Sequence, residues 1–333
     1  MKTRIINFIP FLACWLPLAA IPMTRTFAIC NLGIQLAIFI AAASIPGWRT
    51  GRLSYVDFAW SFGVFCIGIE TAVFAQTFTP QVAAIAGFYL WSGGRMSLLT
   101  VRLYTPRLLQ RDFPRYIYQR KRWTAEGFRS ERLSIQYEIM LQATANASAL
   151  ALPGIIVSTD SASHFGAYET AAVILWATAF GLERIASRQK RTFTQGQNTD
   201  TDVCTVGLWR YSRHPNYFFH WLQWVALAAL AIPSALASRD QHNGVLAALL
   251  VVGLLRTAHL MYYTMVHYTG AVPAEHFSVS KRPAYAEYQM TVNRFFPGPR
   301  RRTRVPVRGN HTHRQLHKQE INDALRDLEV PSA

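Results

Sequence analysis

Long apolar runs separated by short polar segments dominate the hydrophobic pattern of this 333-residue chain. A run of about 20 apolar residues is long enough to cross the hydrocarbon core of a bilayer as one helix. Eight runs meet this description and are predicted to span a membrane: 5–22, 27–47, 56–78, 80–100, 135–157, 168–186, 217–236 and 244–269. The predicted fold is therefore all-α, a polytopic membrane helix bundle of about eight transmembrane helices.

A few polar residues interrupt these runs, namely Asp57, Glu70, Gln142, Asn146 and His259. A polar side chain is costly to place in hydrocarbon. We therefore expect these residues to face the interior of the bundle or a cavity within it.

The loops between the runs differ sharply in charge. Lys and Arg concentrate in 102–132, in 184–213 and from Lys281 onward, whereas the alternate loops carry almost none. Because Lys and Arg accumulate on the cytoplasmic side of short membrane loops, eight spans place all the basic segments on one side. The pattern predicts cytoplasmic N and C termini.

The overall charge is strongly positive, with a formal net charge of +16 and a pI near 10.1. Nucleic-acid binding would place such charge along one face or one helix, whereas here it lies in blocks between apolar runs. No nucleic-acid partner is predicted. The four cysteines (Cys14, Cys30, Cys66 and Cys204) show neither a disulfide framework nor metal-ligand spacing, so no metal site is predicted.

The composition changes near residue 299. Residues 1–299 are predicted to form one membrane-embedded domain, and 300–333 a basic, polar cytoplasmic tail. The basic start of that tail would attract anionic lipid headgroups, or would serve only as a topological stop signal.

One polar motif at the start of a predicted span is the main candidate for a functional site. The run "GLWRYSRHPNYFFHW" covers residues 207–221. Anchoring at the headgroup level explains its Trp and Arg residues but not the His-Pro-Asn step, which gives a fixed turn and a residue that can open the next helix. A helix N-terminus beside Arg210 and Arg213 suits a multi-anionic nucleotide at the cytoplasmic face.

Over about residues 53–297 the chain resembles the steroid 5-alpha-reductase superfamily of membrane reductases. The resemblance rests on "VDFAW", "WSGGRMSLLTVRLY", "DFPRYIYQRKRW", "ERIASRQK", "GLWRYSRHPNYF" and "RPAYAEYQMTVNRFFP". It implies a helical bundle that binds NADPH from the cytosol and reduces a carbon–carbon double bond, conjugated to a carbonyl group, in a steroid-like or other lipid.

The resemblance implies two catalytic candidates, Asp57 and Tyr89. Hydride attack on an enone builds negative charge on the carbonyl oxygen, which needs a preorganised donor in a water-poor cavity. Desolvation would keep the Asp57 carboxyl protonated for this purpose; alternatively, Asp57 caps the third span. Tyr89 matches a catalytic family tyrosine by position; its alternative role is packing.

The resemblance also implies cofactor-binding residues in the fourth span, in the loops and in the closing motif. They are Arg95, Arg102, Gln189, Lys190, Asn198, Trp209, Tyr211, Arg213, His214, Asn216, Tyr217, Glu275, His276, Tyr285 and Tyr288. Trp209 and Tyr288 have packing as the alternative.

The chain departs from the family pattern at four positions, Ser187, Thr194, Phe219 and His220. Changed specificity is the interpretation we favour. Two rival functions stay open: an S-adenosylmethionine-dependent methyltransferase of the isoprenylcysteine carboxyl methyltransferase type, and a non-catalytic lipid-binding relative. The expected location is the endoplasmic reticulum in a eukaryote or the inner membrane in a bacterium.

Overall fold

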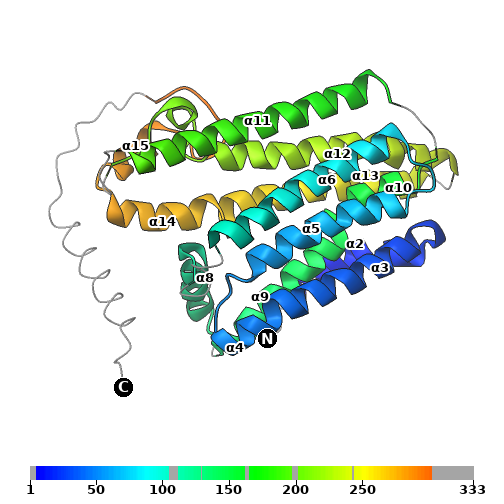
Figure 1. The fold of residues 1–333 in the computed structure, drawn as a ribbon, viewed down its shortest axis with the longest axis horizontal. Coiled ribbons are helices and arrows are strands. Elements are labelled where there is room, and N and C mark those ends of the chain that lie inside the picture. The colour runs from blue at the N-terminus through cyan, green and yellow to red at the C-terminus, as the bar shows by residue number, and fades with distance from the viewer. Residues whose placement is uncertain are drawn as a thin grey trace. The chain divides into compact units, whose positions relative to one another are not determined.

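The structure, a computed structural model, describes residues 5–104, 112–128, 130–161, 165–196, 202–241 and 244–301. Every regular element in these ranges is a helix, so the all-α class is confirmed there (Figure 1).

Each of the eight predicted spans is helical. The corresponding elements are α2 (Ile9–Ala20); α3 (Pro22–Phe39), η1 (Ile40–Ser44) and α4 (Ile45–Thr50); α5 (Val56–Val73); α6 (Pro80–Leu99) and η2 (Thr100–Tyr104); α9 (Glu131–Ala145), η3 (Asn146–Leu150) and α10 (Leu152–Ser158); α11 (Ala167–Gln195); α12 (Pro215–Gln241); α13 (Gly244–Tyr263) and η5 (Thr264–Tyr268). Four shorter elements lie between or after them: α8 (Pro114–Ala125), η4 (Gly207–Arg210), α14 (Ala271–Lys281) and α15 (Tyr285–Thr291).

Five helical segments among the described residues are long and apolar enough to cross a membrane. They are Pro22–Thr50, Val56–Val73, Glu131–Ser158, Pro215–Ser238 and Gly244–Lys281. Helix α2 is apolar but shorter, and the helices at 80–100 and 168–186 carry more polar residues. The multi-pass membrane architecture is thus supported, while the number eight stays a prediction.

The exposed face of α13 shows what surrounds these helices. Val245, Leu249 and Val252 are 68%, 60% and 55% exposed and lie along one face, because their spacing follows the helical period. A continuous row of exposed aliphatic side chains is unfavourable in water and ordinary in lipid. The pattern indicates a membrane-embedded protein.

The chain divides into two units, with the boundaries inside α11, α12 and η5. Unit 1 comprises residues 1–181 and 220–265, and unit 2 comprises residues 182–219 and 266–333. The residues expected to form one membrane domain therefore fall into an apolar unit and a basic, polar one.

A network of buried amides lies inside unit 1. Asn31, Gln35 and Asn146 are fully buried. Gln35 Nε2 donates to Asn31 Oδ1 at 3.0 Å, and Asn146 Nδ2 donates to Gln35 Oε1 at 3.2 Å. Asn146 thus faces the interior as expected, and so does the buried Glu70. His259 does not: it is exposed on α13.

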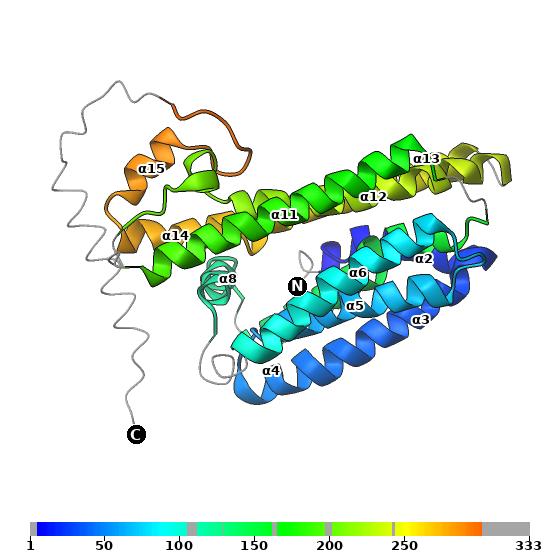
Figure 2. The same ribbon diagram turned by 45° about the horizontal axis from the view of Figure 1, so that its top comes forward.

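Helices α5 and α6 pack closely because glycines remove side chains from their contact, and the two helices lie side by side in Figures 1 and 2. A Cβ atom placed on Gly93 of α6 would lie only 2.4 Å from the backbone nitrogen of Phe65 on α5. A Cβ on Gly68 would lie 2.9 Å from the backbone nitrogen of Leu90. Small residues that let backbones approach are typical of membrane helix pairs.

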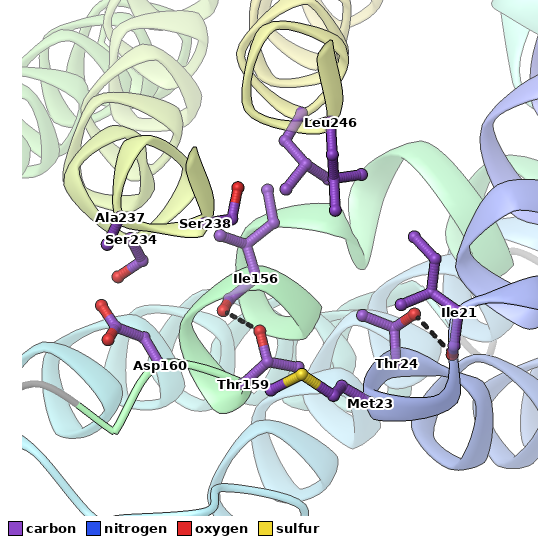
Figure 3. A pocket seen from close by; sticks show the side chains of 11 residues that line it. Ile21, Met23, Thr24, Ile156, Thr159, Asp160, Ser234, Ala237, Ser238 and Leu246 are labelled. Carbon is purple, nitrogen blue, oxygen red and sulfur yellow. Dashed lines mark hydrogen bonds between the residues drawn. The ribbon is translucent and has the colours of Figure 1, made fainter. Parts of the chain in front are cut away.

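A small enclosed cavity of about 30 Å³ lies in unit 1 near the ends of α10 and α12 (Figure 3). Thr159 and Asp160 line it together with Ser234 and Ser238. This volume accommodates a molecule the size of water. The cavity is therefore too small to hold a lipid or a nucleotide.

We expect Gly93→Ala to destabilise the protein by roughly 1–3 kcal/mol, because the methyl group would overlap the backbone of α5. Gly87→Ala, on the same helix, is the matched control, since nothing lies within 4 Å of its Cβ position. Thermal unfolding in detergent measures both. Equal unfolding temperatures for the two variants would contradict the close α5–α6 packing.

Candidate functional site

The polar motif identified in the sequence lies in unit 2 and begins with a tight turn at Gly207. Gly207 has φ +55°, a conformation that favours glycine, and a Cβ there would lie 2.2 Å from Gln189 Nε2. Gln189 Oε1 accepts a hydrogen bond from the backbone N–H of Leu208 at 3.0 Å. Gln189, predicted to bind cofactor, therefore holds the start of η4.

Arg213 and Glu275 form a buried ion pair. They are 6% and 4% exposed, and Arg213 Nε lies 2.7 Å from Glu275 Oε1. Arg213 Nη2 donates to the second carboxylate oxygen at 3.2 Å, while Nη1 donates to the carbonyl oxygens of Gln289 and Val292 at 2.8 and 2.5 Å. Three of the four contacts are shorter than 3 Å, so this guanidinium is largely engaged inside the protein. Its charge is neutralised where a phosphate donor was expected.

The Glu275 carboxylate accepts further hydrogen bonds from side chains of α15 and of the residues that follow it. Gln289 Nε2 and Arg294 Nε each donate to Oε2 at 3.1 Å. His214 Nε2 lies 3.2 Å from Oε1. Because a carboxylate only accepts hydrogen bonds, the Nε2 atom carries the hydrogen in this contact. One carboxylate thereby connects the segment before α12 with α14, α15 and the chain that follows.

His214 is a neutral imidazole in this setting. Burial lowers the pKa of His214 from its ordinary value of 6.5, against the opposing effect of Glu275, and the positive charges of Arg213 and Lys190 act with burial. Its ring stacks on Tyr217 with centroids 5.3 Å apart. The neutral ring and the ionised Glu275 are therefore compatible neighbours.

Trp209 and Tyr288 connect the segments of unit 2. Trp209 Nε1 donates to the carbonyl oxygen of Ala186 on α11 at 2.9 Å. The Tyr288 hydroxyl donates to the carbonyl oxygen of Trp209 at 2.5 Å. Both residues thus hold segments of unit 2 together.

Asn216 and Tyr285 retain hydrogen-bonding capacity. The Oδ1 atom of Asn216, in the first turn of α12, is buried and has no hydrogen-bond partner among the described residues. Tyr285 is buried, which raises its pKa so that the phenol stays protonated. Its hydroxyl makes no hydrogen bond to the residues described. A buried polar atom without a partner is costly, so a ligand group that pairs with Asn216 would be stabilising.

Unit 2 carries a large excess of positive charge. Its described residues, 182–196, 202–219 and 266–301, contain eleven Lys and Arg against four Asp and Glu. Burial lowers the pKa of Lys190, and the charge of Arg282 acts in the same direction. Lys190 Nζ also lies 4.8 Å from the centre of the Trp209 ring. A bound anion would relieve this accumulation of charge.

Asp57, in unit 1, is engaged by side chains of its own unit. Its carboxylate pairs with Arg115 and accepts a hydrogen bond from the Tyr116 hydroxyl at 2.5 Å. The residue lies in the first turn of α5, where a negative charge suits the helix dipole. These contacts fit the alternative reading of a residue that stabilises the start of this helix.

Tyr89 is fully buried in α6, and its hydroxyl donates to the carbonyl oxygen of Leu150 at 2.6 Å. The donor hydrogen is used within unit 1, so the packing role is the one observed. Arg95 lies on the same helix with its guanidinium carbon 5.4 Å from the centre of the Phe180 ring. Arg102, in η2, is exposed.

Tyr211 and His276 are exposed residues of unit 2. The backbone of Tyr211 accepts a hydrogen bond from Gly298, and the His276 ring meets Phe277 edge-on at 5.1 Å. The predicted Asn198 lies outside the described residues.

Comparison with protein families identifies this chain over most of its length. A family model described as "Protein of unknown function (DUF1295)" matches residues 45–292. The chain belongs to the DUF1295 family. This family lies in the steroid 5-alpha-reductase-like superfamily. Comparison with curated proteins and with solved structures found no match to this chain.

The site also contains residues that the sequence did not single out. Ser212 donates to the carbonyl oxygen of Phe295 at 2.8 Å, and Gln289 and Arg294 complete the shell of Glu275. Asp112 accepts hydrogen bonds from the backbone N–H groups of Leu53 and Ser54. Ser212, Gln289, Arg294 and Asp112 all lie in sequence motifs quoted above, with Asp112 at the start of one of them. The sequence alone shows no partner for any of these residues.

Two departures from the superfamily pattern fall within α11 of this DUF1295 protein. Ser187 Oγ donates to Glu183 Oε1 at 3.4 Å, and Thr194 Oγ1 donates to the carbonyl oxygen of Lys190 at 2.9 Å. Both side chains make hydrogen bonds within their own helix. Phe219 is buried and His220 is half-buried at the start of α12.

Glu275→Gln is expected to destabilise the protein by roughly 3–5 kcal/mol, because it leaves the Arg213 guanidinium buried without a counter-charge. Glu287→Gln is the matched control, since Glu287 is exposed on α15. Thermal unfolding of both variants in detergent provides the measurement. A Glu275→Gln variant as stable as the control would show that the pair is dispensable.

Stability should also depend on pH through His214. Its pKa is lower in the folded state than in the unfolded state, so folding releases its proton. The contribution of His214 to the stability of the folded state is complete above the unfolded pKa of 6.5 and is lost as the pH falls below that value. Unfolding temperatures of the wild type should drop more between about pH 7 and pH 5 than those of His214→Asn. Parallel curves for the two proteins, with exposed His276→Asn as reference, would refute this.

Proposed function

We propose that this protein is an integral-membrane oxidoreductase that uses NADPH to reduce a conjugated carbon–carbon double bond in a steroid-like or other lipid. The observation that carries the proposal is the unpartnered, buried Asn216 Oδ1 at the start of α12, in a unit with excess positive charge. Membership of the steroid 5-alpha-reductase-like superfamily supports the choice of reaction.

The residues of unit 2 fit a dinucleotide in their chemistry. Asn216 Oδ1 accepts a hydrogen bond from an amide or hydroxyl group, and the protonated Tyr285 phenol donates one. The cations Lys190, Arg210 and Arg282 would meet the phosphates, together with the N–H groups at the N-terminus of α12. NADPH, when bound, supplies the hydride. The extra phosphate of NADPH suits a unit with many more cations than anions.

Arg213, His214 and Glu275 have a positioning role in this proposal. Their mutual contacts fix the backbone immediately before Asn216, because Arg213 N–H also donates to the Asn293 carbonyl oxygen at 2.9 Å. The neutral His214 adds no charge to the unit at neutral pH. The three residues hold the Asn216 Oδ1 acceptor in position and do not themselves bind the ligand.

The lipid half of the proposal rests on the membrane helices. A substrate that reaches a membrane-embedded enzyme from the bilayer is itself apolar. Asp57 and Tyr89 are not assigned as donors to its carbonyl oxygen, because their polar groups are paired within unit 1. The substrate class proposed is therefore an enone-bearing lipid without a more specific structure.

The identity of the bound small molecule tests the proposal directly. The protein is purified in detergent, denatured, and the released molecules are identified by mass spectrometry. NADP(H), together with consumption of added NADPH in the presence of an enone lipid, is the expected result. Release of S-adenosylmethionine would instead identify the protein as a methyltransferase. If neither molecule is found, the protein is a non-catalytic lipid-binding protein.

Asn216→Ala is expected to weaken NADPH binding by roughly tenfold, equivalent to about 1.4 kcal/mol for one lost hydrogen bond in a buried site. Stability without ligand should not fall, because the wild-type Oδ1 atom has no partner to lose. Ser280→Ala, an exposed position on α14, is the control. Titration calorimetry with NADPH measures the affinities, and equal values for both variants would refute the assignment of Asn216.

A further inference from the structure

Helix α13 carries an arginine that faces outward from unit 1 in the interior of an apolar span. Arg256 is exposed, and no hydrogen bond or ion pair joins it to any residue that the structure describes. The segment Gly244–Lys281, to which it belongs, is long and apolar enough to cross a membrane. A charged side chain within a membrane helix normally faces the bundle interior or a partner group. An arginine that faces outward therefore indicates a ligand or a partner at that place.

The helices around Arg256 provide no counter-charge for it. Helix α13 contains no Asp or Glu, and neither do α10 and η3, which pack against it. Helix α12 also contacts α13, because Trp221 Nε1 donates to the carbonyl oxygen of Ala258 at 3.0 Å. The acid of α12, Asp240, stands near the opposite end, close in sequence to the start of α13. The anion that balances Arg256 therefore comes from outside these helices.

Arg256 begins a polar stripe that continues toward the end of α13. His259 and Tyr263 are also exposed, and their spacing of three and four residues places them on the same helix face. With a rise of 1.5 Å per residue, Arg256 lies about 18 Å along the axis from Gly244, and Tyr263 about 28 Å. In a hydrocarbon core of about 30 Å, Tyr263 is at the headgroup level and Arg256 about 10 Å deeper.

The same face of α13 is aliphatic on the other side of Arg256. Val252, Leu249 and Val245 are exposed and continue the face toward the start of the helix. The row from Val245 to Arg256 is about 16 Å long, close to the acyl layer of one leaflet, which is half of the roughly 30 Å core. Polar donors followed by an apolar surface of this length match the order of groups in a phospholipid.

We propose that this face of α13 binds a phospholipid that enters from the Tyr263 side, with its phosphate at Arg256 and one acyl chain along Leu249 and Val252. A guanidinium donates to a phosphate through two parallel hydrogen bonds, and the imidazole of His259 offers a further donor. The headgroup then lies below its usual level, and the bilayer is thinner at this face, which is one way in which a membrane accommodates an arginine.

The inference is independent of the proposed reductase activity, because none of these residues belongs to the proposed NADPH site. It also distinguishes α13 from the other exposed apolar faces of unit 1. An aliphatic face alone accepts any lipid chain, whereas a guanidinium in the hydrocarbon region selects an anionic group. Since phosphates are abundant at the headgroup level, where the polar stripe ends, a phospholipid is the occupant that this face fits best.

The first experiment varies the thickness of the bilayer. The full-length protein is reconstituted in dimyristoleoyl, dioleoyl or dierucoyl phosphatidylcholine, and its thermal unfolding is measured. Thicker bilayers place the phosphates farther from Arg256, so the wild type should lose about 5 °C or more from the thinnest to the thickest, and Arg256→Leu much less. Arg184→Leu, an exposed arginine of α11, is the control and should behave as the wild type. The same thickness dependence in all three proteins would overturn the proposal.

A second measurement reads the depth of the headgroup without any variant. Dioleoyl phosphatidylethanolamine with a photoreactive diazirine on its amine is incorporated with the wild-type protein and activated by light, and the labelled peptides are sequenced. Labels at residues 252–259 are expected. Labels confined to residue 263 and beyond, where headgroups ordinarily lie, would overturn the proposal, even if Arg256→Leu failed to fold.

Native mass spectrometry identifies the occupant itself. The wild type and Arg184→Leu, extracted from their membrane in a mild detergent, should retain a phospholipid that Arg256→Leu loses. If the wild type instead retains a second protein chain that Arg256→Leu loses, the counter-charge of Arg256 is an acidic residue of a partner helix and the phospholipid site is refuted.

Discussion

The buried carboxylate of Glu275 is the contact on which unit 2 depends. Arg213 is buried with it, and a guanidinium without a counter-charge in such a place would be strongly destabilising. Glu275 also accepts hydrogen bonds from His214, Gln289 and Arg294. One acidic side chain therefore connects the segment before α12, α14, α15 and the chain that follows α15. The polar motif before α12 is ordered by this contact, and the open acceptor of Asn216 is a consequence of that order. The backbone is fixed by its neighbours, and the Asn216 Oδ1 atom has no hydrogen-bond partner among the described residues.

Acidic residues in unit 1 serve the same purpose. Asp57 pairs with Arg115 and Tyr116, and Asp112 accepts from the backbone at residues 53 and 54, so two distant motifs are joined at the start of α5. The described residues of unit 2 contain many more Lys and Arg than Asp and Glu. A unit with such an excess of positive charge attracts anions.

Much of the fold follows from the hydrophobic pattern. Each of the eight apolar runs is a helix, since a backbone in hydrocarbon must satisfy its hydrogen bonds within the segment. The polar motif at 207–221 was also recognisable, because bases, tyrosines and an asparagine at the mouth of an apolar run have no packing explanation. The roles of individual residues were less predictable. Arg213 was expected to bind a phosphate and is paired with Glu275. Asp57 was expected to donate to a substrate carbonyl and is paired with Arg115, and His259 was expected inside the bundle and is exposed.

The sequence by itself determined the helices, their apolar character, the position of the polar motif and the excess of positive charge, because these properties depend on residues close together in the chain. The tertiary structure decided which charges remain available. Arg213 and Glu275 are 62 residues apart, and Asp57 and Arg115 are 58 apart, so no local pattern reveals that they neutralise one another. The same holds for Arg95 and Phe180, which meet from separate helices. Whether a polar side chain binds a ligand depends on whether the fold has already given it a partner.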